Sequence, residues 1–164
     1  LGLIKKKALM IKINTISNNK DWLLYLENPS NFIESESKKL NKNIKKYKKK
    51  SIHLTLLLSG NKEIKKLNNQ FRGKNKSTDV LSFPFYNKRE LKKKLKNEKE
   101  IYLGDIIVNL QKVKKKNNKN EFKFEFNKLW IHGLVHLFGH DHKMDKDFYI
   151  MSKVEKKYLS YLYK

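Results

Sequence analysis

The sequence predicts a single domain of the α/β (α+β) class, in which about five helices pack on a small mixed sheet. Segments with strand-like and helix-like apolar spacing alternate along the chain, and no internal repeat is visible. The length of 164 residues fits one domain with its own hydrophobic core. We assign this domain to residues 10–164, because the first strand pattern begins at Met10. Residues 1–9 are predicted to be a non-native or disordered N-terminal extension from an alternative start, with little structural role.

The first strand and the first helix are predicted near the start of this domain. Apolar and polar residues alternate over residues 10–17, which is typical of a strand. Pro29 and Ser30 are typical of a helix start, and a loose apolar stripe extends this helix to about residue 48. The basic run KKYKKK at residues 45–50 is predicted to be its solvated end, where cations interact favourably with the helix dipole.

The middle of the chain is predicted to hold two strands, a helix and a connection. Residues 51–58 (SIHLTLLL) predict a buried strand, and residues 62–71 predict a short helix. Residues 79–85 (DVLSFPF) predict a strand that Pro84 either ends or confines to an edge of the sheet. Residues 87–100 are mostly charged, and we expect them to form an exposed connection.

The last strand and three helices complete the predicted order. Residues 101–109 predict a strand with Gly104 inside it, and residues 110–118 predict a short helix or its remnant. A long helix is expected from about residue 122 to 138. The final helix, at about residues 145–163, carries apolar residues at helical spacing.

Charge and composition narrow the classes of partner. The chain has 39 Lys and Arg against 16 Asp and Glu, a formal net charge of +23. Such a field attracts polyanions, so nucleic acid is the first partner to consider and an anionic membrane surface the second. A genome rich in A and T would also encode additional lysines throughout the chain, which weakens the argument from net charge to nucleic-acid binding. The absence of cysteine excludes disulfides and thiolate metal sites and is compatible with a reducing cytoplasm. No apolar run predicts a transmembrane helix or a signal peptide.

The stretch IHGLVHLFGHDH, at residues 131–142, contains four of the five histidines. His132 and His136 are four residues apart, which places both on one face of a helix. Gly139 is typical of a helix end, and His142 lies beyond it, where the returning chain can bring it to the same metal. Two ligands from a helix and a third from the following turn are typical of catalytic zinc with an open position. We therefore predict one Zn²⁺ per chain, bound by these three histidines.

Three neighbours of these histidines leave alternatives open. His140 is four residues beyond His136, so a continuous helix would make it the third ligand, although Gly139 argues against continuation. Asp141 either orients an imidazole or forms the turn, and we favour the turn. Gly133 either leaves backbone room beside the metal or permits tight helix packing. Gly133 stands where His-Glu-x-x-His proteases have glutamate, which argues against a protease, and the predicted chemistry is metal activation of water.

A second unusual stretch is the loop LNNQFRGKNKSTDVLSFPF, at residues 67–85. Arginine is scarce in a chain where lysine is abundant, so Arg72 is predicted to have a specific role. Its guanidinium group is suited to donating two hydrogen bonds to a phosphate.

Three motifs of this chain resemble those of the YbeY family, bacterial endoribonucleases that act in rRNA maturation. The motifs are NNQFRGKNKSTDVLSFPF, LGDIIVN and HGLVHLFGHDH, which occur in the family's order. The resemblance implies an α/β domain with a mixed four-stranded sheet and a zinc ion on His132, His136 and His142. It places the family's functional arginine on Arg72. His140 departs from the family, which usually has tyrosine there, and adds an imidazole beside the third ligand.

The resemblance also implies a function. The expected activity is cleavage of single-stranded RNA in maturation of the small-subunit (16S) rRNA 3′ end and in ribosome quality control. The expected partners are rRNA, the small ribosomal subunit and ribosomal or assembly-factor proteins. The expected location is the cytoplasm, and no membrane is expected among the partners.

Two other functions fit the same residues. One is a metal-dependent hydrolase of a small phosphate ester or amide, which would have a closed, narrow pocket. The other is a non-catalytic, RNA-binding ribosome-assembly factor whose zinc is structural. We interpret Asp79 and Asp105 as structural residues and His53 as a packed or edge histidine within its strand.

Overall fold

The computed structural model describes residues 10–164, so the extension predicted for residues 1–9 lies outside the described residues. The strands in this part of the chain are β1 (Ile11–Ser17), β2 (Ser51–Ser59), β3 (Val80–Pro84) and β4 (Glu100–Asn109). The α-helices there are α1 (Pro29–Asn43), α2 (Asn61–Arg72), α3 (Lys88–Asn97), α4 (Lys119–Leu137) and α5 (Asp145–Leu162). Two short 3-10 helices are η1 (Lys20–Leu24) and η2 (Leu110–Lys112).

The four strands form one mixed sheet in the order β1-β2-β4-β3. β1, β2 and β4 run parallel, whereas β3 runs antiparallel to β4 and forms one edge. Pro84 is the last residue of β3 and pairs with Gly104, so this strand both lies at an edge and ends at the proline, as predicted. The mixed sheet confirms the predicted fold class.

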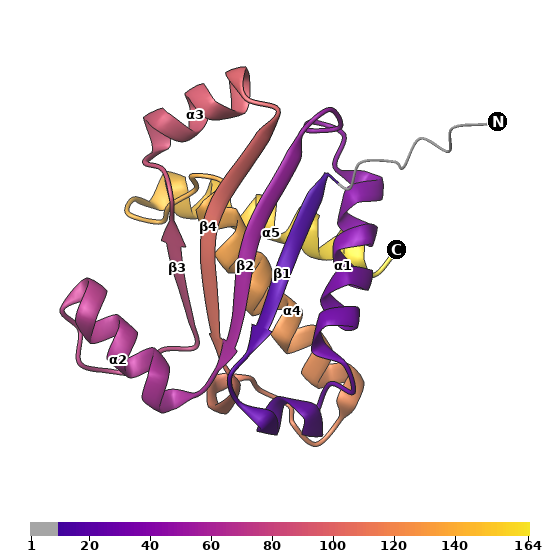
Figure 1. Cartoon of the computed structure of the whole chain (residues 1–164), viewed down its shortest axis with the longest axis vertical. Coiled ribbons are helices and arrows are strands. Elements are labelled where there is room, and N and C mark those ends of the chain that lie inside the picture. Colours follow the sequence, from indigo (N-terminus) through magenta and orange to yellow (C-terminus); the bar gives the residue numbers. More distant parts are fainter. Residues whose placement is uncertain (1–9) are drawn as a thin grey trace.

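The helices form unequal layers on the two faces of the sheet (Figure 1). α1, α4 and α5 cover one face, where alternate residues of β2, such as Leu54 and Leu56, pack in the main core with Trp130 of α4. α2 covers part of the other face, where Ile64 joins Leu81 and Ile107 in a smaller core. The rest of this second face has no helix over it in the described part of the chain (Figure 1).

α4 approaches the sheet closely at Gly133. A Cβ atom at this position would lie 2.6 Å from Cγ2 of Ile106 on β4, closer than atoms can pack. Tight packing therefore accounts for this glycine, and it resolves the choice between packing and room for the metal. The close approach brings the C-terminal half of α4, with its histidines, against the sheet.

The expectation of an exposed connection at residues 87–100 is wrong, because a helix, α3, forms within it. Asn87 and Glu90 form a reciprocal capping box: the Asn87 side chain accepts from the Glu90 N–H, and Glu90 accepts from the Asn87 N–H. This arrangement satisfies two donors that a helix start leaves unpaired. Leu91 is buried in the core, and Leu95 packs against it one turn later. Two apolar residues anchor the helix, but the many charges around them hide this pattern in the sequence.

Two helix boundaries also differ from the prediction. α1 ends at Asn43, so the basic run at residues 45–50 lies in turns and not at the end of a helix. Tyr47 is buried and stacks on Phe138 of the helical layer at a centroid distance of 5.3 Å, which favours a turn over continued helix. α4 begins at Lys119, three residues before the expected start, because the Asn118 side chain caps it.

The segment at residues 110–118 contains only the three-residue η2, a remnant of the short helix expected there. Within residues 10–164, no helix combines the length and the apolar character that crossing a membrane requires.

Candidate metal site

His132 and His136 lie one turn apart near the end of α4, as their spacing predicts. Their Nε2 atoms are 3.1 Å apart, and their ring centroids are separated by 4.7 Å. Both side chains are partly buried. The regular helix therefore aims two imidazoles at the same point.

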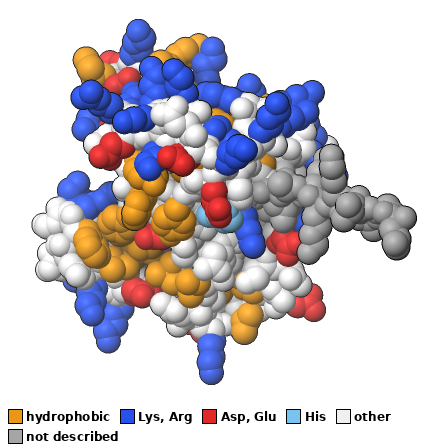
Figure 2. All heavy atoms as spheres, turned by 45° about the horizontal axis from the view of Figure 1, so that its top comes forward, with side chains coloured by type: hydrophobic (Ala, Val, Ile, Leu, Met, Phe, Trp, Pro, Cys, Tyr) orange, Lys and Arg blue, Asp and Glu red, His pale blue; other side chains and the backbone are white. Residues whose placement is uncertain are grey.

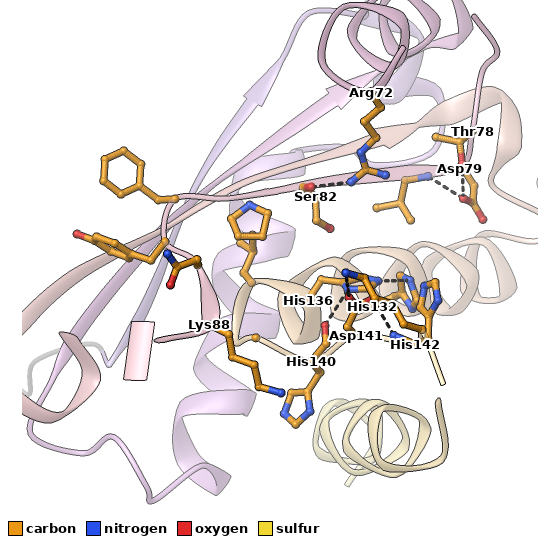
Figure 3. A pocket seen from close by; sticks show the side chains of 18 residues that line it. Arg72, Thr78, Asp79, Ser82, Lys88, His132, His136, His140, Asp141 and His142 are labelled. Atoms are coloured by element: carbon orange, nitrogen blue, oxygen red, sulfur yellow. Dashed lines mark hydrogen bonds and ion pairs between the residues drawn. The ribbon is translucent and has the colours of Figure 1, made fainter. Parts of the chain in front are cut away.

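His142 reaches the same point from beyond the helix end. Gly139 has a φ of +91°, a conformation that glycine adopts without the steric cost that a Cβ atom imposes, and the chain turns back there. The centroid of the His142 ring lies 5.1 Å from that of His136 and 6.0 Å from that of His132. One nitrogen of each ring lies within 4.8 Å of the others, so the three predicted ligands form one cluster (Figure 3).

The hydrogen bonds of the rings indicate which nitrogens are free to bind a metal. His136 Nδ1 lies 2.9 Å from the carbonyl oxygen of His140, and His132 Nδ1 lies 2.7 Å from Glu155 Oε1 on α5. A carbonyl oxygen and a carboxylate oxygen only accept hydrogen bonds, so each Nδ1 donates. In neutral rings, both Nε2 atoms then present lone pairs to each other. A metal cation that accepted both lone pairs would remove the repulsion between them, and the donor set fits zinc.

Burial favours the neutral form of His136 that a metal requires. Removal from water lowers the pKa of His136, and the nearby His132 lowers it further. The imidazole of His136 therefore loses its proton more readily than an exposed histidine as pH rises, which leaves its Nε2 lone pair available.

His140 contributes its backbone to the site, and its side chain is not among the clustered ligand atoms. Figure 3 shows its ring directed away from the other histidines, next to Lys88. Burial lowers the pKa of His140, and the positive charges of Lys88 and Lys46 lower it further. Asp141 Oδ1 accepts the backbone N–H of His142 at 2.8 Å, which supports the turn interpretation of this residue.

Arg72 approaches the groove from a different element. It is the last residue of α2, and its Nη2 donates to the backbone oxygen of Ser82 on β3 at 2.9 Å. The guanidinium carbon lies 5.7 Å from the centroid of the Phe83 ring. These contacts hold Arg72 beside the edge strand, with the histidines of α4 on the other side of that strand (Figure 3).

Arg72 and the three histidines line one groove with a volume of about 910 Å³. Lys88 and Lys143 add positive charge to its walls, and Phe85 and Tyr86 add aromatic surface. The tertiary structure thus brings together all four site residues predicted from the sequence.

The other polar residues of the motifs make local contacts. Asp79 lines the groove and accepts the N–H of Val80 at 2.8 Å, a contact that orders the start of β3. Asp105 accepts a hydrogen bond from the Tyr102 hydroxyl on the open sheet face. His53 lies on the same face, 3.2 Å from a carboxylate oxygen of Glu100, and is separate from the metal cluster.

Sequence reasoning did not identify Glu155. It lies on α5, 23 residues after His132, and only the packing of α5 against α4 brings the two together. A signal is nevertheless present, since Glu155 follows Val154 and lies one turn after Met151, a buried position of the same helix. An acidic residue beside the apolar face of a helix is a candidate partner for a buried or metal-binding group.

Comparison with known proteins identifies relatives of this chain. The family model described as Endoribonuclease YbeY matches residues 16–163 of the chain. The chain belongs to the Endoribonuclease YbeY family. This membership confirms the resemblance that the three sequence motifs predicted.

Individual family members match most of the chain. The Endoribonuclease YbeY of Pelagibacter ubique is 46% identical over 148 residues, which cover 89% of this chain and 92% of the relative. The Endoribonuclease YbeY of Ehrlichia canis is 33% identical over 157 residues, which cover 93% of each chain. A protein of Thermotoga maritima with a solution structure is also similar, with a TM-score of 0.57 and 30% identity over 93% of this chain and 89% of that one.

Glu155→Ala is expected to weaken zinc binding by about 10- to 100-fold, as is typical when the carboxylate partner of a metal-binding histidine is lost. Glu155→Gln, which keeps an oxygen acceptor without the charge, should weaken it less. Competition with a fluorescent zinc chelator measures both affinities. Glu125→Ala, which removes an ion pair with Lys128 elsewhere on α4, is the matched control and should bind zinc normally. Equal affinity of Glu155→Ala and wild type would contradict this role.

Proposed function

We propose that this member of the Endoribonuclease YbeY family uses one zinc ion, bound by His132, His136 and His142, to cleave single-stranded RNA. The proposed substrate is rRNA of the small ribosomal subunit near its 3′ end, and the proposed setting is rRNA maturation and ribosome quality control in the cytoplasm. Ribosomal or assembly-factor proteins are the proposed protein partners.

One observation carries this proposal: three clustered imidazoles and an arginine line a single groove. Arg72 supplies the donors that a phosphodiester requires, and the histidines supply the ligands that zinc prefers. Because Lys88 and Lys143 also line the groove, its charge suits an extended polyanion better than a neutral amide. The groove volume of about 910 Å³ falls within the range of about 300–1,000 Å³ that is typical of small-molecule sites, so the lysines, and not the volume, favour a polymer.

Each residue has a separate task in the proposed reaction. Zinc held by His132, His136 and His142 would make its bound water far more acidic than bulk water and so supply a nucleophile at neutral pH, or it would polarise a phosphoryl oxygen. Glu155 holds the His132 ring in the tautomer that leaves Nε2 unprotonated, and the carbonyl oxygen of His140 does the same for His136. Arg72 donates to the phosphate and stabilises the negative charge that grows in the transition state.

Removal of the metal tests the proposal. Dialysis against a chelator should abolish cleavage of a precursor small-subunit rRNA 3′-end fragment, and about one zinc per chain should restore it. Elemental analysis gives the metal content, and gel electrophoresis of labelled RNA gives the cleavage rate. A duplex of the same sequence is the control for strand preference and should be cut more slowly.

The two alternative functions predict different outcomes. A zinc-loaded protein that binds rRNA but does not cut it, even in ribosomal particles, would favour the assembly-factor function. Cleavage of a small phosphate ester without cleavage of RNA would favour the other metal-dependent hydrolase. Full RNA cleavage by folded, metal-free protein would contradict the role of zinc.

A further inference from the structure

Phe85 is an exposed aromatic residue in the wall of the groove that contains the three histidines. Its side chain is 65% exposed, although it lies directly after β3, next to the edge of the folded core. No role in metal binding or phosphate binding explains an apolar ring at this position.

Backbone contacts hold Phe85 in place, so the point from which its ring projects is well defined. Phe85 follows Pro84, whose backbone φ is restricted by its ring, and its N–H donates to the oxygen of Leu103 on β4 at 2.9 Å. β4 passes unusually close here, since a Cβ atom at Gly104 would lie 2.2 Å from the Phe83 oxygen and 2.9 Å from the Phe85 nitrogen. Gly104, with a φ of +133°, permits this approach.

Two tyrosines support the Phe85 ring without stacking on it in parallel. The centroid of Tyr86 lies 5.0 Å away with an angle of 83° between the rings, and that of Tyr102 lies 5.9 Å away with an angle of 80°. Tyr102 is itself held by hydrogen bonds to Thr55 and Asp105. The ring is thus supported by perpendicular neighbours and remains largely exposed to a planar ligand.

Positive charges accompany this aromatic surface. Lys88, three residues after Phe85, lines the same groove, and the Lys94 ammonium lies 5.7 Å from the Tyr86 ring centroid. Figure 2 shows hydrophobic side chains gathered on the face of the molecule that it presents, with Lys and Arg crowded along the adjoining edge. An exposed ring beside phosphate-binding cations is the arrangement with which proteins bind single-stranded nucleic acid.

We propose that Phe85 is a base-stacking subsite that receives an unpaired base of the RNA strand near the bond to be cleaved. The inference rests on the proposed function, because the strand must lie in the groove between the histidines and Arg72. Only a base that has left a duplex exposes its flat face to such a ring, so Phe85 selects single-stranded over double-stranded RNA. The residue positions the strand and takes no part in the chemistry.

Fluorescence of RNA containing 2-aminopurine tests this subsite, because stacking on an aromatic ring quenches that base. Zinc-loaded protein is mixed with short single-stranded RNAs that carry the analogue at successive positions, and fluorescence is read by stopped flow before cleavage accumulates. One position should be quenched by the wild type. Phe85→Ala should lose this quenching and bind the RNA about 5- to 150-fold more weakly, the effect typical of one stacked base. Phe85→Trp should retain both the quenching and the RNA affinity of the wild type.

Further measurements separate stacking from general effects. The salt dependence of binding should be the same for Phe85→Ala and wild type, since no phosphate contact is removed. The preference for single-stranded over duplex RNA should fall in Phe85→Ala. Phe124→Ala, on α4 where its ring contacts Tyr163, removes an aromatic residue outside the groove and should change none of these readouts.

Unchanged quenching and affinity in Phe85→Ala would overturn the inference and leave the ring available for a protein partner. The proposed function fails by a different result: RNA that binds and quenches normally but is not cleaved by the zinc-loaded protein. The two failures are distinguishable because quenching needs no cleavage.

Discussion

Replacing His136 with alanine is expected to abolish zinc binding and to lower RNA cleavage by roughly 10³-fold or more, because water on zinc would be far more acidic than bulk water. The ring centroid of His136 lies 4.7 Å from that of His132 and 5.1 Å from that of His142, and its Nε2 is 3.1 Å from the His132 Nε2. Alanine is a favourable residue in a helix, so α4 should persist. On one preparation, elemental analysis measures the bound zinc, circular dichroism measures the helix content, and the rRNA assay measures the cleavage rate.

The matched control for this variant is His53→Ala. His53 is the one histidine outside the cluster motif, and it lies on the open face of the sheet near Glu100. His53→Ala should keep its zinc and its cleavage rate. If His136→Ala folds and still cleaves RNA at the wild-type rate, the proposed metal site is wrong. If it unfolds, the zinc is structural, as expected for the assembly factor.

Arg72→Ala is expected to lower the cleavage rate by about 10²- to 10³-fold, the usual cost of losing one donor that stabilises transition-state charge. Binding of uncleaved RNA should weaken only slightly, because many lysines share the contacts to the backbone. Single-turnover cleavage at saturating protein gives the rate, and filter binding of the RNA gives the affinity.

Arg72→Lys makes this prediction more specific. The guanidinium of Arg72 bonds to the Ser82 oxygen through one nitrogen and retains further donors, whereas a lysine has a single ammonium group for both tasks. Arg72→Lys should therefore remain well below wild type. Lys74→Ala, two residues after Arg72 and beyond the end of α2, is the control and should change only the salt dependence slightly. A fully active Arg72→Lys would show that charge alone suffices and would contradict a role that depends on guanidinium geometry.

The sequence alone predicted which three histidines cluster, for a local physical reason. A regular helix brings residues four apart onto one face, so the spacing of His132 and His136 predicts their proximity. Glycine readily reverses the chain after a helix, so Gly139 predicts the return of His142. The strand-like segments and the edge position of the strand ending at Pro84 are likewise local properties, because alternation and the missing proline N–H act within one segment.

The tertiary structure decided the features that join distant segments. Glu155 reaches His132 only because α5 packs on α4, and Arg72 joins the histidines only because α2 ends beside β3. α3 depends on two leucines that the surrounding charges hide in the sequence. The exposure of Phe85 in the groove follows from the close approach of β4 to the end of β3. Local spacing specifies neighbours along one element, whereas contacts between elements depend on how their apolar faces pack together.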